Sequence, residues 1–137
     1  MILIVCIDNK NGMLFNRRRQ SQDRILRARI LQLTAQSRLW MNAYSAKQFD
    51  ISAPQICVAE DFLSQAAPGE YCFLENPVPS NLLEQTEQVI LYRWNRDYPA
   101  DVYFALDLSG FQLRQTTDFA GSSHKKITEE IYTLCKN

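Results

Sequence analysis

Seven apolar or alternating segments divide the chain and predict the strands of one sheet. Residues 2–7 form a continuous run rich in Ile and Val, which is typical of a strand buried on both faces. The other six segments are short apolar runs or alternate between apolar and polar residues, and turn-forming residues mark their ends. The predicted strands cover residues 2–7, 39–41, 56–58, 71–74, 89–94, 111–119 and 125–134, with a further short strand at 102–104.

One amphipathic helix and three short helical segments lie between these strands. Ser21 is a candidate N-cap for a helix over residues 22–35. We expect residues 13–19, which precede this helix, to form an ordered loop. We expect the short helices over residues 46–49, 62–66 and 80–84, capped by Ser45, Asp61 and Ser80.

Strands that alternate with helices and end in a long hairpin favour an α/β fold. The 137 residues are enough for one domain, which we assign to residues 1–137. The pattern predicts a mostly parallel sheet with an antiparallel edge. Ligands of such sheets bind beyond the carboxyl ends of the strands, so we expect the site near residues 8–19 and 42–45.

Asp23 interrupts the apolar face of the long helix. It falls on the same side as Leu26, Ile30 and Leu33, within about 80° of one another at 100° per residue. A carboxylate aimed at a core or pocket is costly unless it is paired, hydrogen-bonded or protonated, which makes Asp23 the candidate catalytic residue. In an enclosed cavity, burial should raise its pKa unless a donor compensates. The alternative is an exposed acid in the first turn, favoured by the helix dipole.

Composition describes an ordinary soluble globular protein and excludes several classes. No apolar run approaches the roughly 20 residues of a membrane span, and the first seven residues lack the basic region of a signal peptide, so we expect the cytoplasm. The chain has one histidine, His124, which we place at the entrance of the last strand. Its four cysteines show no Cys-x-x-Cys spacing, so we predict buried free thiols and no metal site.

The zero net charge hides a segregation of basic and acidic residues. Residues 10–47 carry nine Lys or Arg and one acid, whereas residues 48–92 carry seven acids and no base. One explanation is that the two segments attract each other within the fold. The other is an anion- or RNA-binding site on Arg17, Arg18 and Arg19, since guanidinium groups bind phosphate bidentately. Few aromatic residues accompany these arginines, which disfavours nucleic acid.

The order of elements resembles the dihydrofolate reductase family along the whole chain. The opening strand followed by Asp-Asn-Lys-Asn-Gly-Met at residues 8–13 is similar to that family's first strand and flexible loop, and Asp23 occupies the place of its substrate-binding carboxylate. Leu-Trp-Met at 39–41 resembles its second strand, and Asp-Val-Tyr-Phe at 101–104 resembles its Asp-Thr-x-Phe. The resemblance implies a shortened three-layer α/β/α sandwich with a mixed, mostly parallel sheet and a C-terminal antiparallel hairpin. It also implies a substrate pocket lined by Phe15, Asp23, Leu26, Ile30 and Tyr92.

The departures from the family pattern fall mainly in the cofactor site. The family's Gly-Arg-x-Thr is replaced by Asn-Ala-Tyr-Ser at 42–45, so only the hydroxyl of Ser45 remains for the cofactor. The family's Gly-Gly, which lets the backbone approach a diphosphate, is replaced by Glu75 and Asn76. Tyr92 stands where a threonine supports the substrate carboxylate, and the segment that holds the adenosine end is much shorter.

Two classes of function follow, with a third behind them. The pattern favours a divergent relative that lacks NADPH-dependent activity, needs no cofactor, and acts as a small-ligand-binding or interaction protein, with a heteroaromatic ligand expected. The alternative is a reductase of a pterin-like or other heteroaromatic substrate that binds NAD(P)H, such as NADPH, or a flavin differently. The third is the anion- or RNA-binding module on the arginines. The sequence predicts neither a partner nor an oligomeric state.

Overall fold

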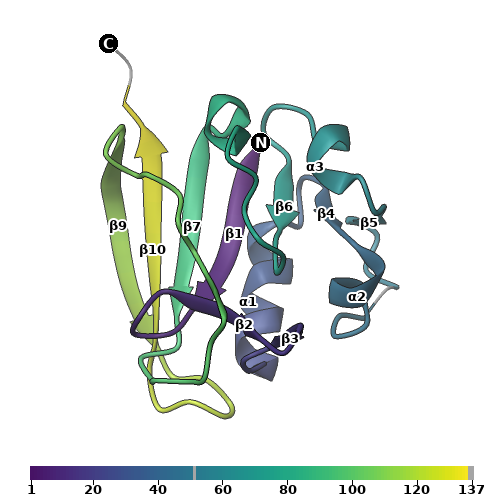
Figure 1. The fold of residues 1–137 in the computed structure, drawn as a ribbon. Coiled ribbons are helices and arrows are strands. Elements are labelled where there is room, and N and C mark those ends of the chain that lie inside the picture. Colours follow the sequence, from purple (N-terminus) through teal and green to yellow (C-terminus); the bar gives the residue numbers. More distant parts are fainter. Residues whose placement is uncertain (51, 136–137) are drawn as a thin grey trace.

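A seven-stranded mixed sheet forms the centre of the computed structural model, which describes residues 1–50 and 52–135 (Figure 1). The strands run in the order β5-β4-β6-β1-β7-β10-β9. The five strands from β5 to β7 are parallel, and β10 is antiparallel to both β7 and β9. All seven predicted main strands are therefore confirmed, as β1 (Ile2–Ile7), β4 (Leu39–Met41), β5 (Ile56–Val58), β6 (Tyr71–Phe73), β7 (Gln88–Arg93), β9 (Phe111–Phe119) and β10 (Ile127–Leu134).

Strand β1 lies inside the sheet and contributes to a core on each face. Leu3, Val5 and Ile7 pack in one cluster of buried residues, and Ile2 and Ile4 pack in the other. Successive residues of a strand point to opposite faces, so a continuous apolar run is what a strand covered on both sides needs.

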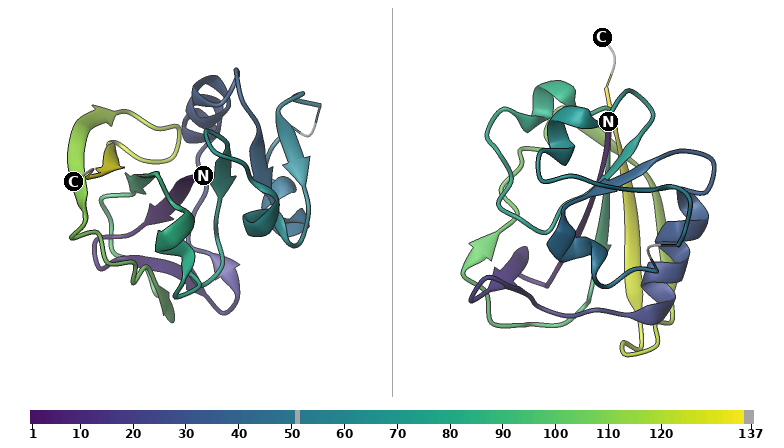
Figure 2. Two further views of the ribbon diagram at one scale, coloured as in Figure 1. Left: turned by 90° about the horizontal axis from the view of Figure 1, so that it is seen from above. Right: turned by 90° about the vertical axis from the view of Figure 1, so that its right-hand side faces the viewer.

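The two faces are covered differently, as the view from above shows (Figure 2, left). Helices α1 (Arg24–Leu33) and α2 (Ala43–Ala46) cover the face of Ile2 and Ile4. The opposite face is covered by α3 (Phe62–Gln65), the 3-10 helix η1 (Leu82–Gln85) and part of a small three-stranded sheet. The three-layer α/β sandwich is confirmed, with one outer layer that is partly β-structure.

The small sheet corrects the prediction of a loop over residues 13–19. Strands β2 (Gly12–Phe15) and β3 (Arg18–Arg19) form a hairpin, and β8 (Val102–Tyr103) pairs with β2. The connecting residues Asn16 and Arg17 both have positive φ, 51° and 62°. Two consecutive residues with positive φ make a tight turn that matches the twist of the strands. The second of these positions usually holds glycine, and Arg17 stands there, so the residue pattern does not indicate the hairpin.

Helix boundaries differ from the predicted ones where a different side chain supplies the cap. Helix α1 begins at Arg24 because Asp23, and not Ser21, is its N-cap. Helix α2 begins at Ala43 because the Asn42 side chain accepts from the Ser45 N–H, so Ser45 lies inside the helix. The cap belongs to the residue whose oxygen faces the free N–H groups, which the backbone path decides.

Candidate functional site

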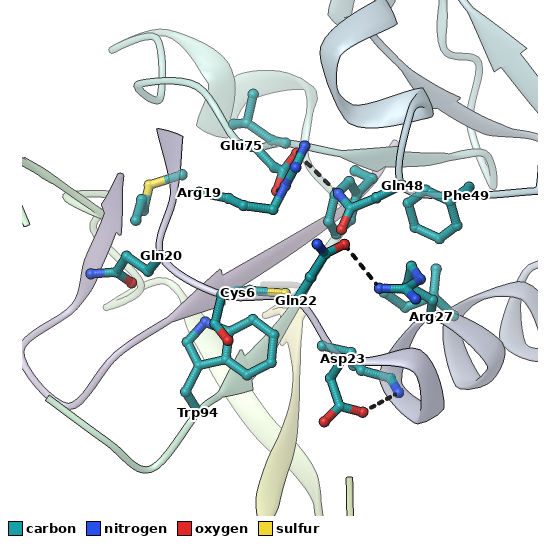
Figure 3. A pocket seen from close by; sticks show the side chains of 16 residues that line it. Cys6, Arg19, Gln20, Gln22, Asp23, Arg27, Gln48, Phe49, Glu75 and Trp94 are labelled. Carbon is teal, nitrogen blue, oxygen red and sulfur yellow. Dashed lines mark hydrogen bonds and ion pairs between the residues drawn. The ribbon is translucent and has the colours of Figure 1, made fainter. Parts of the chain in front are cut away.

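A narrow cavity lies between α1 and the sheet, near the carboxyl end of β1. Figure 3 shows the residues around it. Its volume is about 20 Å³, enough for one water molecule. Leu26 and Ile30 of α1 line it, as predicted for the substrate pocket. The other lining residues are Cys6, Met13, Arg19, Gln20, Ser21, Gln22, Asp23, Arg27, Gln48, Phe49, Phe73, Leu74, Glu75 and Trp94.

The Asp23 carboxylate is buried and accepts hydrogen bonds on both oxygens. Oδ1 accepts from the N–H groups of Ile25, Leu26 and Ser122, at 3.0, 3.1 and 3.0 Å. Oδ2 accepts from the N–H of Ser123 at 2.8 Å and its hydroxyl at 3.0 Å, and lies 3.2 Å from His124 Nδ1. The carboxylate therefore joins the first turn of α1 to the β9–β10 connection, about one hundred residues away in the chain.

These donors decide the ionisation of Asp23. Burial by itself raises the pKa, but the hydrogen bonds from the backbone of Ser123, Ser122 and Leu26 and from His124 lower it well below its ordinary value of 3.8. The alternative of an exposed first-turn acid is therefore wrong, and the donors compensate the burial that would otherwise raise the pKa of Asp23. In Figure 3 the carboxylate points away from Arg19 and Glu75. A carboxylate offers about four lone-pair positions, so a ligand must displace one of these donors to use it.

His124 extends this network, and the sequence offered no sign of its burial. Only 4% of the residue is exposed, and its ring stacks on Trp94 at 4.5 Å between centroids. Its Nε2 lies 2.8 Å from the hydroxyl of Tyr98. The network therefore connects the helix, the last hairpin and the loop after β7.

Gly121 allows the hairpin connection to approach Asp23. A Cβ at this position meets the Asp23 carboxylate and lies 2.8 Å from Ile127 Cδ1. We predict that Gly121→Ala lowers the free energy of unfolding by about 1–3 kcal/mol, measured by urea denaturation. Gly110→Ala is the matched control, since nothing lies within 4 Å of its Cβ. Equal stability of the two variants would show that the close approach does not matter.

A second carboxylate, the largely buried Glu75, is held at the other end of the cavity (Figure 3). Its Oε2 lies 2.8 Å from Arg19 Nε, and its Oε1 accepts from Arg19 at 3.1 Å. The hydroxyl of Ser45 and the amide of Gln48 also donate to Oε1, at 2.8 and 3.1 Å. Arg19 in turn lies over the ring of Tyr44, 4.3 Å from its centroid. We call Arg19, Tyr44, Ser45, Gln48 and Glu75 the Glu75 cluster.

The Glu75 cluster brings together residues predicted for two different sites. Arg19, one of the three predicted anion-binding arginines, binds an anion of the protein itself, the carboxylate of Glu75. Ser45, predicted to contact a cofactor, donates to the same carboxylate. The hypothesis that the basic and acidic segments attract each other holds at this pair, whereas Arg17 and Arg18 lie exposed on the β2–β3 hairpin.

Phe15 and Tyr92, the other two predicted pocket residues, lie outside the cavity. Phe15 ends β2 and is 41% exposed, because the hairpin turns its ring outward. Tyr92 is buried, and its hydroxyl donates to Glu129 at 2.7 Å. Glu129 also pairs with Arg29 of α1. Tyr92 therefore stabilises the contact between α1 and β10, and the predicted five-residue pocket is brought together only in part.

Other predicted properties concern metals, thiols and membranes. Within residues 1–50 and 52–135, no group of three or more His, Cys, Asp or Glu side chains is placed to hold a metal ion. Cys72 is buried, and burial raises its pKa to about 12, but Cys6 and Cys57 are half-buried and Cys135 is exposed, contrary to prediction. No helix in the described part of the chain is long and apolar enough to cross a membrane.

Comparison with known proteins identifies the fold. No protein-family model matches the chain, and no curated protein sequence matches it. The chain is similar in structure to dihydrofolate reductase from Enterococcus faecalis, solved with NADP(H) and RAB-propyl, with a TM-score of 0.67. The match covers 98% of this chain and 96% of that one at 10% sequence identity. The chain therefore has the dihydrofolate reductase fold. At 10% identity the similarity establishes the fold and not the activity.

Proposed function

We propose that this protein is a small-ligand-binding domain of the dihydrofolate reductase fold that lacks NADPH-dependent reductase activity. The observation that carries the proposal is the Glu75 cluster. By its resemblance to the family, Glu75 stands where two glycines let the backbone approach the cofactor diphosphate. A carboxylate here repels a diphosphate and occupies the donors that a phosphate needs.

The residues present do not fit the diphosphate of NADPH. Arg19 and Ser45 are the nearest candidates for phosphate donors, and both already donate to Glu75. Each charge-assisted hydrogen bond forgone is worth roughly 1.5–3 kcal/mol of binding. Two such losses, with added repulsion from Glu75, reduce affinity by several orders of magnitude.

The state of Asp23 supports the same proposal. A reductase of this family anchors the substrate ring on this carboxylate, by the resemblance that the sequence carries. Here Asp23 accepts from the helix and from residues 122–124 instead. A heteroaromatic ring that used it would have to break the contact between α1 and the last hairpin.

The walls of the cavity favour a flat, largely apolar ligand with at least one N–H group. Phe49, Phe73 and Trp94 supply aromatic surface. The Oε1 of Gln20 is buried and has no hydrogen-bond partner. Within residues 1–50 and 52–135, every other buried side-chain nitrogen or oxygen has one. A ligand N–H satisfies such an acceptor. Because the cavity has room for about one water molecule, binding requires some of its lining side chains to move apart.

We test the proposal by following thermal unfolding while NADPH is added. Stabilisation follows RT ln(1 + [L]/Kd), so a ligand that does not bind leaves the melting temperature unchanged. We expect a shift below about 1 °C at roughly 0.1 mM NADPH. A shift of several degrees at micromolar NADPH contradicts the proposal and favours the alternative, a reductase that binds its nucleotide differently.

A further inference from the structure

A second hollow, larger and more open than the cavity under α1, lies beside the β2–β3 hairpin. Its volume is about 490 Å³, within the usual range for small-molecule sites. It is formed by one side of the hairpin and by the loop after β7. The lining residues are Phe15, Asn16, Arg18, Arg19, Gln20, Tyr98 and Pro99.

Two aromatic rings and a proline supply the apolar part of this hollow. Phe15 is 41% exposed, so its ring is accessible to a ligand in the hollow. Tyr98 is half-buried and Pro99 follows it directly. Aromatic faces gathered in a concave surface favour a flat ring as occupant.

The walls are held in place without a ligand. The Asn16 N–H donates to Asp101 Oδ2 at 3.1 Å, which fixes the hairpin turn. The Tyr98 N–H donates to the buried Asp8 at 3.2 Å, and its hydroxyl lies 2.8 Å from His124 Nε2. A preorganised site avoids the entropy loss of ordering its walls when a ligand binds.

Arg18 supplies a positive charge that the protein does not neutralise. Arg19 pairs with Glu75, whereas Arg18 forms no ion pair within residues 1–50 and 52–135. A free guanidinium beside two aromatic faces matches a ligand that carries both a ring and an anionic group.

We propose that this hollow binds a planar aromatic phosphate, with its ring against Phe15 and Tyr98 and its phosphate on Arg18. The hollow shares Arg19 and Gln20 with the cavity of the proposed function, but Phe15, Arg18 and Tyr98, which carry this proposal, do not line that cavity. The proposed ligand is a single aromatic phosphate, and neither RNA nor a cofactor diphosphate is required to occupy the hollow. Arg18, one of the arginines predicted as anion-binding, thereby gains a second component, an aromatic surface.

The test uses 1-naphthyl phosphate as the probe, with isothermal titration calorimetry on the full chain. We expect wild type to bind it with Kd below about 1 mM, and to bind 1-naphthol or inorganic phosphate at least about tenfold more weakly. Arg18→Gln and Phe15→Ala should each weaken binding by about tenfold or more. Arg17→Gln is the matched control, since it removes the same charge from the same hairpin outside the hollow, and it should stay within about twofold of wild type.

Three outcomes overturn the inference. The first is no measurable binding of the probe to wild type at about 5 mM. The second is an equal loss in Arg17→Gln and Arg18→Gln, which indicates diffuse charge attraction. The third is inorganic phosphate binding as tightly as the probe, which indicates an adventitious ion only. Both Phe15 and Arg18 are exposed, so neither substitution should prevent folding, and circular dichroism checks this.

Discussion

Replacing Asp23 with asparagine is expected to lower the free energy of unfolding by about 3 kcal/mol or more, because it leaves buried N–H groups facing a neutral amide. The amide keeps the size of the side chain but replaces one accepting oxygen with a donor. That donor then faces the N–H and hydroxyl of Ser123 or the N–H groups of Ile25 and Leu26. Urea denaturation at pH 7 measures the loss.

Asp61→Asn is the matched control for this experiment. Asp61 is also the N-cap of a helix, α3, but its side chain makes no capping hydrogen bond, and the residue is exposed. The same change of charge and shape there should alter stability by no more than about 0.5 kcal/mol. An equally small effect at Asp23 would contradict the structural role that its contacts indicate.

The effect of Asp23 should also depend on pH in a defined direction. Its folded-state pKa lies below the ordinary value of 3.8, so the ionised carboxylate stabilises the folded state at pH values above that value. This contribution is lost as pH falls below about 4 and through the folded-state pKa. The difference in stability between wild type and Asp23→Asn should therefore narrow on acidification. A difference that widens between pH 7 and pH 3 would show that the carboxyl is not stabilised as an anion.

Removing the Glu75 carboxylate is expected to destabilise the protein by about 2–4 kcal/mol, since it leaves the guanidinium of Arg19 in a largely buried position without its partner. The Arg19 and Glu75 side chains are only 19% and 10% exposed, so solvent compensates little. Glu75→Ala also leaves a space beside three donors, from Arg19, Ser45 and Gln48. We expect inorganic phosphate to fill it and to restore part of the melting temperature.

Phosphate distinguishes an anion site occupied by Glu75 from a general salt effect. Glu84→Ala is the control, because it removes the same charge from an exposed position. At about 50 mM phosphate, the Glu75 variant should gain more stability than wild type or the Glu84 variant, as mass action requires of a vacant site. Equal gains in all three proteins would show that the vacated space binds no anion, and that Glu75 does not occupy a phosphate site.

The positions of the main strands along the chain, the mostly parallel sheet and its antiparallel edge were determined by the sequence itself. The continuous apolar run of β1 requires cover on both faces, and the short turn between the segments of β9 and β10 makes them an antiparallel hairpin. The spacing of apolar residues along the chain shows which faces of a strand or helix are buried, so burial can be inferred from the sequence. The same logic marked Asp23 as unusual, because a carboxylate on an apolar helix face stands out whatever its partners are.

Only the tertiary structure decided what Asp23, Arg19 and Glu75 do. The donors of Asp23 in the last hairpin lie 99 to 101 positions away along the chain, and Glu75 lies 56 positions from Arg19. A hydrogen bond depends on distances of a few tenths of an ångström between atoms of distant segments, and no residue pattern carries that information. The sequence therefore identified the charged groups that needed partners, while the folded backbone chose the partners and with them the chemistry that each group can perform.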